Sequence, residues 1–415
     1  LGAETRNEAL HAGNRALLEG AATVTGVVSY SGEYRFDAIA VRNGARVVVP
    51  DGLKATDFEV GAGEVRLPQR VEVANLTVKS GAVAGSSTSL LNLTVTGVLK
   101  VESGATLSAT AKGYAGATTS TALGGAPVGV LGSSLDAGGS HGGKGSLHGG
   151  GVAGDVYGSV YVPQLSGGGG SYDYTAGGAG GGVLQLKVGE LVLDGVIEAR
   201  GETRALISSA RGGAGAGGSV VVDAGVIRGA GAIDVSGGDF VGCQSTWSRA
   251  GGGGRAALYA TTLSGFDPAT EGKAWGGGLY SCSMAPIAGW YGGAGTVYVR
   301  AGGMTYGQLL IDSGLESGGV KRLGPDVQLP VLGNGTVTAV AVAGNDAWVT
   351  GASSFGAQWQ GSWMVLEGAA GTLGTYRVLQ VSGNQVLLEG GSAVTNATTY
   401  RGEYRFDAIK VRNGA

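Results

Sequence analysis

The feature that most constrains the fold is a series of short apolar runs, each of which follows a cluster of glycines. The runs VLQL, VVVD, AALY and TVYV follow the clusters GGAGGG, GGAGAGG, GGGGR and YGGAG. Leu184, Val221, Ala257 and Val297 within these runs lie 37, 36 and 40 residues apart. Apolar and polar residues alternate in such runs, which predicts β-strands with one buried face. A regular spacing of this kind predicts stacked structural repeats.

Further short runs extend this pattern, and no segment shows a convincing helical periodicity. GVIEA and GAIDV begin at Gly195 and Gly231, again 36 residues apart. Residues 4–19 imitate an amphipathic helix, but their counterpart at 374–389 has the alternation of strands, so we expect β structure there too. Short strands without helices leave a sandwich, a barrel, a propeller or a β-helix. The sequence therefore predicts an all-β protein.

The composition supports a packed core and excludes several classes of protein. Glycine accounts for 86 of 415 residues, yet 43% of the residues are hydrophobic, which a disordered glycine-rich linker would lack. Glycine does not recur at every third position, so the chain is not collagen-like. A net charge of −3 argues against a nucleic-acid surface. No run of 18 apolar residues occurs, which predicts no membrane span.

The rung-like runs and polar turns resemble the right-handed parallel β-helix of secreted bacterial adhesins. That resemblance implies a β-helix-like solenoid over residues 32–330, with four long Gly-rich loops that project from one side or edge. From residue 331 the glycine clusters stop and longer strands begin. Two hairpins are expected there, with turns at Gly344 and Gly383. Residues 331–401 are therefore predicted to form a small antiparallel β barrel or sandwich.

One long segment occurs twice in the chain. Residues 13–45 and 383–415 are identical at 22 of 33 positions with a constant offset of 370. Within them, 32–45 and 402–415 differ only at Ala40 and Lys410. We interpret the chain as one period of a longer series of repeats. Residues 1–31 would then be the tail of the small β module of a preceding repeat, and residues 402–415 the first strand of the next.

The two copies are expected to occupy equivalent positions at a repeat junction. The paired junction residues are Tyr34 with Tyr404 and Phe36 with Phe406. Alternate residues of a strand point to opposite faces, so a preserved register keeps the same set of residues buried in both copies.

Cys243 and Cys282 lie 39 residues apart in similar loops that contain glycine and tryptophan. We predict a disulfide between neighbouring loops, and two buried free thiols are the alternative, because geometry decides whether a bond forms. The two thiols have no further Cys or His at ligand spacing, so we predict no metal site there.

Few residues offer catalytic or metal chemistry. His141 and His148 stand in a loop that is nearly all glycine, where polar loop residues are expected rather than metal ligands. Glu198 and Asp234 are 36 residues apart and could face each other on neighbouring strands, as acid pairs do in β-helix polysaccharidases. Both precede turns, where acidic residues are common. The glycine clusters match neither a P-loop nor the calcium-binding nonapeptide. We therefore predict no cofactor and no enzymatic activity.

Aromatic residues gather in or beside the Gly-rich loops. Their faces could stack on sugars, or they could pack the glycine loops against one another. Side-by-side glycine runs could also bundle in the manner of polyglycine II. These possible contact residues are Tyr172, Tyr174, Trp247, Trp275, Tyr280, Trp290 and Tyr291.

The chain also resembles the modular giant surface proteins of bacteria, which alternate solenoid blocks with small β modules. This resemblance implies a structural or adhesive repeat unit of a long extracellular filament or cell-surface adhesin. Its expected partners are further copies of the repeat, in the same chain or head to tail, and possible additional partners are glycans or cell surfaces. The alternative is a β-helix protein that binds or degrades polysaccharide, similar to a tailspike or a lyase. The repeat at offset 370 favours the structural interpretation.

Overall fold

The computed structural model describes most of the chain and shows a nearly all-β protein. The described residues are 15–19, 34–42, 46–49, 53–61, 63–147, 149–205, 212–241, 249–280, 290–315, 319 and 321–415. Within them the one α-helix is the four-residue α1 (Pro268–Glu271), beside two 3-10 turns. This confirms the predicted fold class at the level of all-β.

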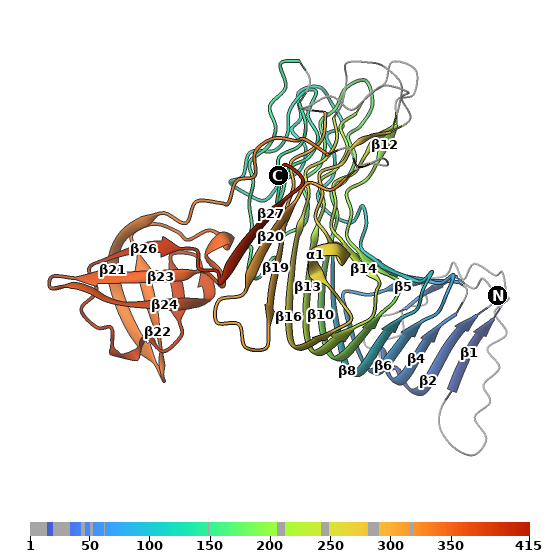
Figure 1. Cartoon of the computed structure of the whole chain (residues 1–415), viewed down its shortest axis with the longest axis horizontal. Helices are drawn as coiled ribbons and strands as arrows, with labels where there is room; N and C mark the ends of the chain where they lie inside the picture. Colours follow the sequence, from blue (N-terminus) through green and yellow to red (C-terminus); the bar gives the residue numbers. More distant parts are fainter. Residues whose placement is uncertain are drawn as a thin grey trace.

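Two large sheets form the body of the described structure (Figure 1). The 11-stranded sheet contains, in spatial order, β1 (Arg15–Glu19), β2 (Tyr34–Arg42), β4 (Leu53–Val60), β6 (Arg70–Val78), β8 (Leu90–Val101), β10 (Val183–Leu193), β13 (Ser219–Arg228), β16 (Arg255–Ser264), β19 (Thr296–Ala301), β20 (Gln308–Asp312) and β27 (Ala408–Arg412). The 7-stranded sheet contains β17 (Gly272–Lys273), β14 (Ala232–Asp234), β11 (Val196–Glu198), β9 (Thr106–Ser108), β7 (Val83–Ser86), β5 (Glu64–Leu67) and β3 (Arg46–Val48). Neighbouring strands are parallel, apart from the antiparallel pair β19–β20.

From β2 to β17 the chain passes alternately between the larger and the smaller sheet, so that each passage adds one strand to both. Aliphatic side chains in register therefore stack between the sheets. Leu93, Leu186, Val222, Leu258 and Val299 form one such column, and all five are buried. Each contributes about 1.5–3 kcal/mol to folding through the apolar surface that it removes from water.

The register differs by one residue from the predicted spacing. Leu184 pairs with Val220, not with Val221, and Ala256 pairs with Val297. Leu184 and Val220 are both buried in the core, whereas Val221 lies on the opposite face and is partly exposed. A one-residue slip exchanges the faces of a strand, and a run of three valines gives no alternation from which to place it.

The Gly-rich connections all leave strands of the smaller sheet and return to strands of the larger one. They comprise residues 109–182, 199–218, 235–254 and 274–295. Their described parts gather on one side of the sheets, seen at the top of Figure 1, and we call this assembly the glycine bundle. A three-stranded sheet of β12 (Arg204–Ala205), β15 (Phe240–Val241) and β18 (Leu279–Tyr280) joins three of the connections.

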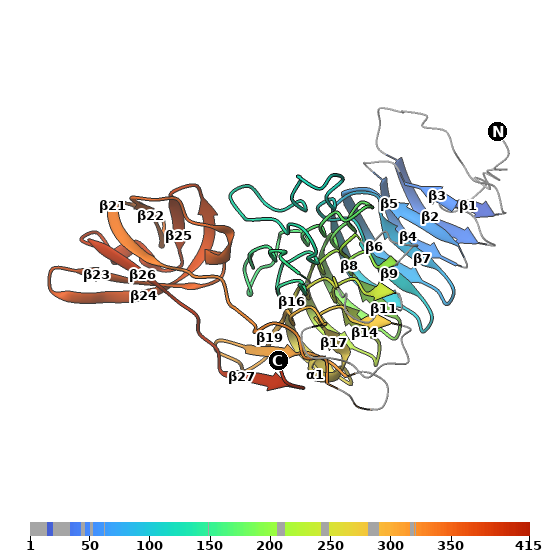
Figure 2. The same ribbon diagram turned by 90° about the horizontal axis from the view of Figure 1, so that it is seen from above.

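The predicted small module is a closed antiparallel barrel. Its order is β21 (Asn334–Ala343), β22 (Asp346–Gly351), β25 (Gln385–Leu388), β24 (Gly371–Ser382), β23 (Trp363–Gly368) and β26 (Thr399–Glu403). Both predicted hairpins are present, with Gly344 and Gly383 at φ of 65° and 59°, a conformation that favours glycine. Trp359 and Val386 lie in its separate core. The barrel continues to Glu403, two residues beyond the predicted boundary. Figure 2 shows it at one end of the molecule and β1–β3 at the other.

Candidate functional site

Only the last parts of the two copies, in β2 and β27, lie near opposite ends of the larger sheet. Their earlier parts differ, because residues 15–19 form β1 in that sheet, whereas residues 385–388 form β25 of the barrel. In the first copy β2 is a continuous strand that pairs in parallel with β1 and β4. In the second copy residues 404–407 lead out of the barrel without forming a strand, and β27 then pairs in parallel with β20. The five residues that both copies place in this sheet are therefore 38–42 and 408–412.

The same side chains differ sharply in burial between the two copies, so the expectation that the preserved register buries the same residues in both is wrong. Ile39 and Val41 are 6% and 0% exposed, because they face the core between the two sheets. Their counterparts Ile409 and Val411 are 58% and 57% exposed. A strand with a free edge and an uncovered apolar face is a ready site for further pairing. This end of the sheet, residues 408–412, is the junction edge.

An aromatic cluster holds the junction edge against the rest of the chain. The Tyr161 ring stacks on Phe406, with ring centroids 5.4 Å apart, and meets Tyr298 edge to face at 5.0 Å. The Tyr161 hydroxyl accepts a hydrogen bond from the Arg405 amide and donates one to its carbonyl oxygen. Burial raises the pKa of Tyr404 to about 12, so its hydroxyl stays protonated and donates to the Pro330 carbonyl oxygen. These contacts fix residues 404–406 of the second copy against the long connection between β9 and β10 and against β19.

The sequence indicated Tyr404 and Phe406 but missed their partners. Tyr161 comes from the long connection between β9 and β10, and Tyr298 lies on β19. The alternation of TVYV could have placed Tyr298 on the face opposite the core. Nothing in the sequence around Tyr161 signals its contact with residues that are more than 240 positions away.

The glycine bundle has the hydrogen-bond pattern of polyglycine II. Residues 213–218 donate successive amide hydrogens to three different neighbouring segments, and every third residue returns to the same neighbour. Gly215 and Gly218 donate to Glu202 and Ala199, Ala214 and Gly217 to Arg249 and Gly252, and Gly213 and Ala216 to Ser171 and Gly168. A left-handed helix with three residues per turn and no internal hydrogen bonds produces this geometry. Side-by-side glycine runs therefore do bundle in the manner of polyglycine II.

Two buried cations and a histidine lie in the bundle or at its border, where Arg255 begins β16. Arg249 pairs with the carboxylates of Asp136 and Asp173, the latter at 2.9 Å. Arg255 donates from Nε to the Tyr157 carbonyl oxygen and from Nη1 to the Thr296 hydroxyl. Burial lowers the pKa of Arg255 to about 10. Each buried guanidinium therefore has oxygen partners, as buried charged groups require.

His141 is fully buried, which corrects the expectation of a polar loop residue. Its Nδ1 lies 2.8 Å from the Gly217 carbonyl oxygen, so the neutral ring donates there. Burial, with the nearby positive charge of Arg255, lowers the pKa of His141 to about 3. His148 lies outside the described residues. No group of three or more potential metal ligands occurs in the part of the chain that the structure describes.

We expect the low pKa of His141 to make folding sensitive to acid. The unfolded chain binds a proton near pH 6.5, whereas the folded chain does not until about pH 3, so acidification in this range favours unfolding. This group alone should lower the free energy of unfolding by about 2 kcal/mol between pH 7 and pH 5. Denaturant titrations of wild type and His141→Gln at both pH values test this. Equal pH dependence in the two proteins would contradict it.

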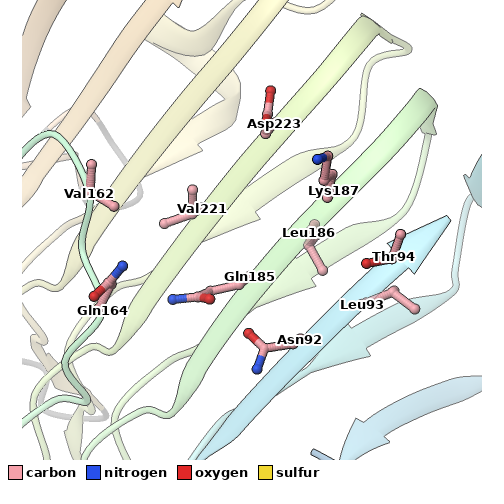
Figure 3. Close-up of a pocket in the computed structure, with 10 residues that line it drawn as sticks. All are labelled: Asn92, Leu93, Thr94, Val162, Gln164, Gln185, Leu186, Lys187, Val221 and Asp223. Atoms are coloured by element: carbon pink, nitrogen blue, oxygen red, sulfur yellow. The ribbon is translucent and has the colours of Figure 1, made fainter. Parts of the chain in front are cut away.

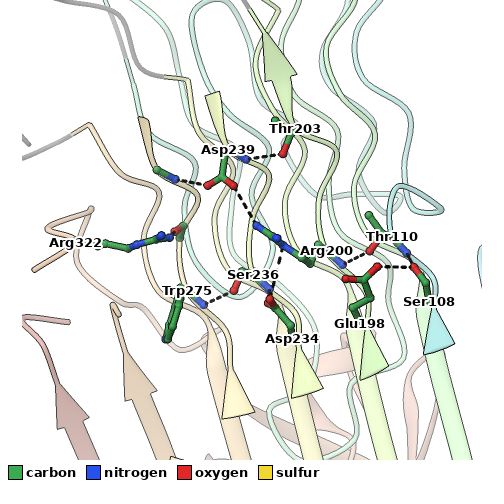
Figure 4. Close-up of polar contacts among 12 residues, drawn as sticks. Ser108, Thr110, Glu198, Arg200, Thr203, Asp234, Ser236, Asp239, Trp275 and Arg322 are labelled. Atoms are coloured by element: carbon green, nitrogen blue, oxygen red, sulfur yellow. Dashed lines mark hydrogen bonds and ion pairs between the residues drawn. The ribbon is translucent and has the colours of Figure 1, made fainter. Parts of the chain in front are cut away.

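The acidic residues considered for catalysis are held by nearby donors (Figure 4). Glu198 and Asp234 are register partners on β11 and β14, as expected. The Glu198 carboxylate accepts a hydrogen bond from the Ser108 hydroxyl at 2.9 Å. The guanidinium of Arg200 lies 3.8 Å from Asp234 and 3.1 Å from Asp239. These contacts fix the chain where it passes from the smaller sheet into the bundle.

The predicted aromatic contact residues are divided between packed and exposed positions. The centroid of the Trp275 ring lies 5.3 Å from the Lys273 amine and 5.3 Å from the central carbon of the Arg322 guanidinium. The ring also fills the space beside Gly314. Tyr174 is exposed. The remaining positions are Tyr172 and Trp290, which are partly exposed, Tyr291, which is buried, Tyr280 in β18, and Trp247, which lies outside the described residues. Whether these side chains bind a ligand or only pack stays a prediction.

The fold and the junction edge define a class of protein: an all-β chain with large parallel sheets and an appended antiparallel barrel. Comparison with known proteins finds no matching family model, no matching curated protein and no matching solved structure. Among the described residues, no helix is long and apolar enough to cross a membrane.

Proposed function

We propose that the chain is a structural or adhesive repeat unit of a long extracellular filament or surface adhesin. The observation that carries this proposal is the junction edge. A near-copy of the segment that begins the larger sheet becomes the last strand of the same sheet, with two apolar side chains uncovered. A sheet whose edge strand β27 is a near-copy of part of β2 is suited to continuation by another copy.

Within this proposal, residues 32–330 form a β-helix-like solenoid. Its support is the alternation of the chain between two parallel sheets around a common aliphatic core. Continuous hydrogen-bond ladders and buried stacks would make each unit rigid, while the bundle and barrel project as contact surfaces. Further copies of the repeat are the principal partners, and glycans or cell surfaces are the partners of the projecting parts.

The solution shape of a two-copy chain tests this function. Residues 46–415 can be joined directly after Ala415, because residues 402–415 repeat residues 32–45. Small-angle X-ray scattering of this two-copy chain should show a rigid particle with about twice the maximum dimension of the single chain. A spacer of ten Gly-Ser residues at the same joint provides the flexible control. If the directly joined chain were as flexible as the chain with the spacer, the proposal would be contradicted.

Thiol chemistry tests the extracellular part. Cys243 and Cys282 lie outside the described residues, and their disulfide stays a prediction. The described strands before them, β15 and β18, pair with the 39-residue offset that separates the cysteines. A bridge would stabilise the chain by about 3–4 kcal/mol and would persist in an oxidising compartment. Thiol titration of the denatured, unreduced protein from its native source should find no free thiol. Two free thiols would contradict the disulfide and would count against the extracellular location.

A hollow on the outer face of the larger sheet supports the alternative function, polysaccharide binding (Figure 3). Its volume is about 280 Å³. Asn92, Gln185 and Gln164 line it with amides, and Lys187 and Asp223 add opposite charges. Such groups can donate to and accept from sugar hydroxyls. Binding on a glycan array that is lost in Gln185→Ala, with unchanged thermal stability, would favour this alternative.

A further inference from the structure

The two junction strands present their apolar side chains to opposite faces of the larger sheet. In β2, Ile39 pairs with Phe58 and points to the core between the two sheets. In β27, Ile409 pairs with Leu309, which in turn pairs with Tyr298. Tyr298 lies outside that core, in the cluster around Tyr161. Paired residues of neighbouring strands share a face, so Ile409 lies on the face opposite this core.

The direction of the strands is reversed at the same place. Strands from β2 to β19 run parallel to one another, but β20 is antiparallel to β19, and β27 is parallel to β20. The short hairpin between Ala301 and Gln308 therefore reverses the strand direction for the last two strands of the sheet, β20 and β27 (Figure 1). A half turn about the axis along which the strands stack has these two effects together: it reverses the strands and exchanges the faces of the sheet.

We propose that a second copy of this chain continues the larger sheet from β27, rotated by about half a turn about the long axis of the sheet. This inference rests on the proposed function and adds the identity and orientation of the partner. The occupant of the junction edge is the segment 46–78 of the second copy, which carries β3 to β6. Its β4 pairs in parallel with β27, and its core lies on the face where Ile409 and Val411 are exposed.

The contacts that β2 makes with β4 specify this pairing. Ile39 and Val41 pair with Phe58 and Val60, so Ile409 and Val411 meet the same two side chains of the second copy. Arg42 forms an ion pair with Glu59 at 3.1 Å, and Arg412 takes its place. Glu59 is also paired with Lys79 of its own copy, at 2.9 Å. Lys410, which replaces Ala40, lies opposite Glu59 and adds a third positive charge beside that carboxylate.

The other edge of the junction strands provides independent support. Residues 15–19 of β1 pair with residues 38–42 of β2, and residues 308–312 of β20 pair with residues 408–412 of β27. The two registers are therefore equivalent at all five positions. In the single chain, β1 pairs in parallel with the edge of β2 that faces away from β4. In a series of copies, β20 of the preceding copy would pair with the equivalent edge in the same register.

Electron microscopy of a three-copy chain, joined in the same way as the two-copy chain, tests the half turn. The glycine bundle enters the larger sheet at the beginnings of its strands, so reversed strands place successive bundles on opposite sides of the rod. We expect bundles and barrels that alternate from side to side. A straight rod with all bundles on one side would overturn this inference and leave the proposed function standing. Copies joined without fixed orientation would overturn both.

Zero-length cross-linking tests the register in the two-copy chain. A carbodiimide should join Lys410 of the first copy to Glu59 of the second, with loss of the product when the second Glu59 is changed to Gln. Ile409→Asp in the first copy should abolish the cross-link and loosen the rod, yet leave the melting temperature of the single chain unchanged, because this side chain is exposed there. Lys410→Ala should leave the two-copy chain as rigid as wild type. An unaltered rod with Ile409→Asp would overturn the proposed pairing.

Discussion

Gly215→Ala should strongly destabilise the glycine bundle. A Cβ atom at this position would lie 1.9 Å from the Ala179 carbonyl oxygen and 2.4 Å from its carbon. Both atoms belong to backbone that is itself hydrogen-bonded, so neither can move aside cheaply. Overpacking of this kind costs about 3 kcal/mol or more. Denaturant unfolding of the variant should show this loss, together with a lower melting temperature.

Gly150→Ala is the matched control for this prediction. Its Cβ would meet nothing within 4 Å, and its backbone does not require a left-handed conformation. The same methyl group should therefore be neutral or stabilise by up to about 1 kcal/mol through the unfolded chain. If the two variants lost equal stability, close packing would not explain why glycine is needed in the bundle.

Arg249→Met should cause the second large loss of stability. The arginine side chain is only 1% exposed, and it lies between the carboxylates of Asp136 and Asp173. Methionine fills a similar volume but leaves two acidic groups without their cation. Removing one partner of a buried ion pair costs about 3–5 kcal/mol, and the lower end applies here because both carboxylates retain some solvent contact. Equilibrium unfolding at neutral pH measures the difference.

Two further variants separate charge from packing. Arg228→Met removes an exposed ion pair with Glu190 and should cost less than about 1 kcal/mol. Adding Asp136→Asn and Asp173→Asn to Arg249→Met removes the unpaired charges and should recover much of the loss. Asn suits position 136, where φ is 55°. No recovery in the triple variant would show that the arginine acts through shape alone.

The strands and the barrel could be predicted from local pattern. Alternation in residues 183–186 and 296–299 signals strands, and both are strands of the larger sheet. Gly-Asn at 344–345 and 383–384 signals hairpin turns, and both occur. These features depend on neighbouring residues, because the period of a strand and the left-handed φ of a turn glycine are local properties.

The candidate site was predictable only in part. Repetition identified Tyr404 and Phe406, whereas Tyr161 and Tyr298 come to them from distant segments. His141 looked like a solvated loop residue, because its glycine neighbours suggested flexibility. The bundle buries it instead, since glycine chains without side chains approach closely enough to exclude water. Close packing of this kind depends on several segments at once, so no single segment reveals it.

The sequence by itself determined the class of structure, the strands, the barrel turns and the presence of two nearly identical junction segments. These follow from residue type and spacing. Only the tertiary structure decided which face each junction segment presents. Ile39 and Ile409 stand in nearly the same sequence, yet one is buried and the other is exposed. The antiparallel hairpin formed by β19 and β20 makes the difference. It reverses the strand on which β27 pairs, and its register places Leu309, and with it Ile409, on the face opposite the core.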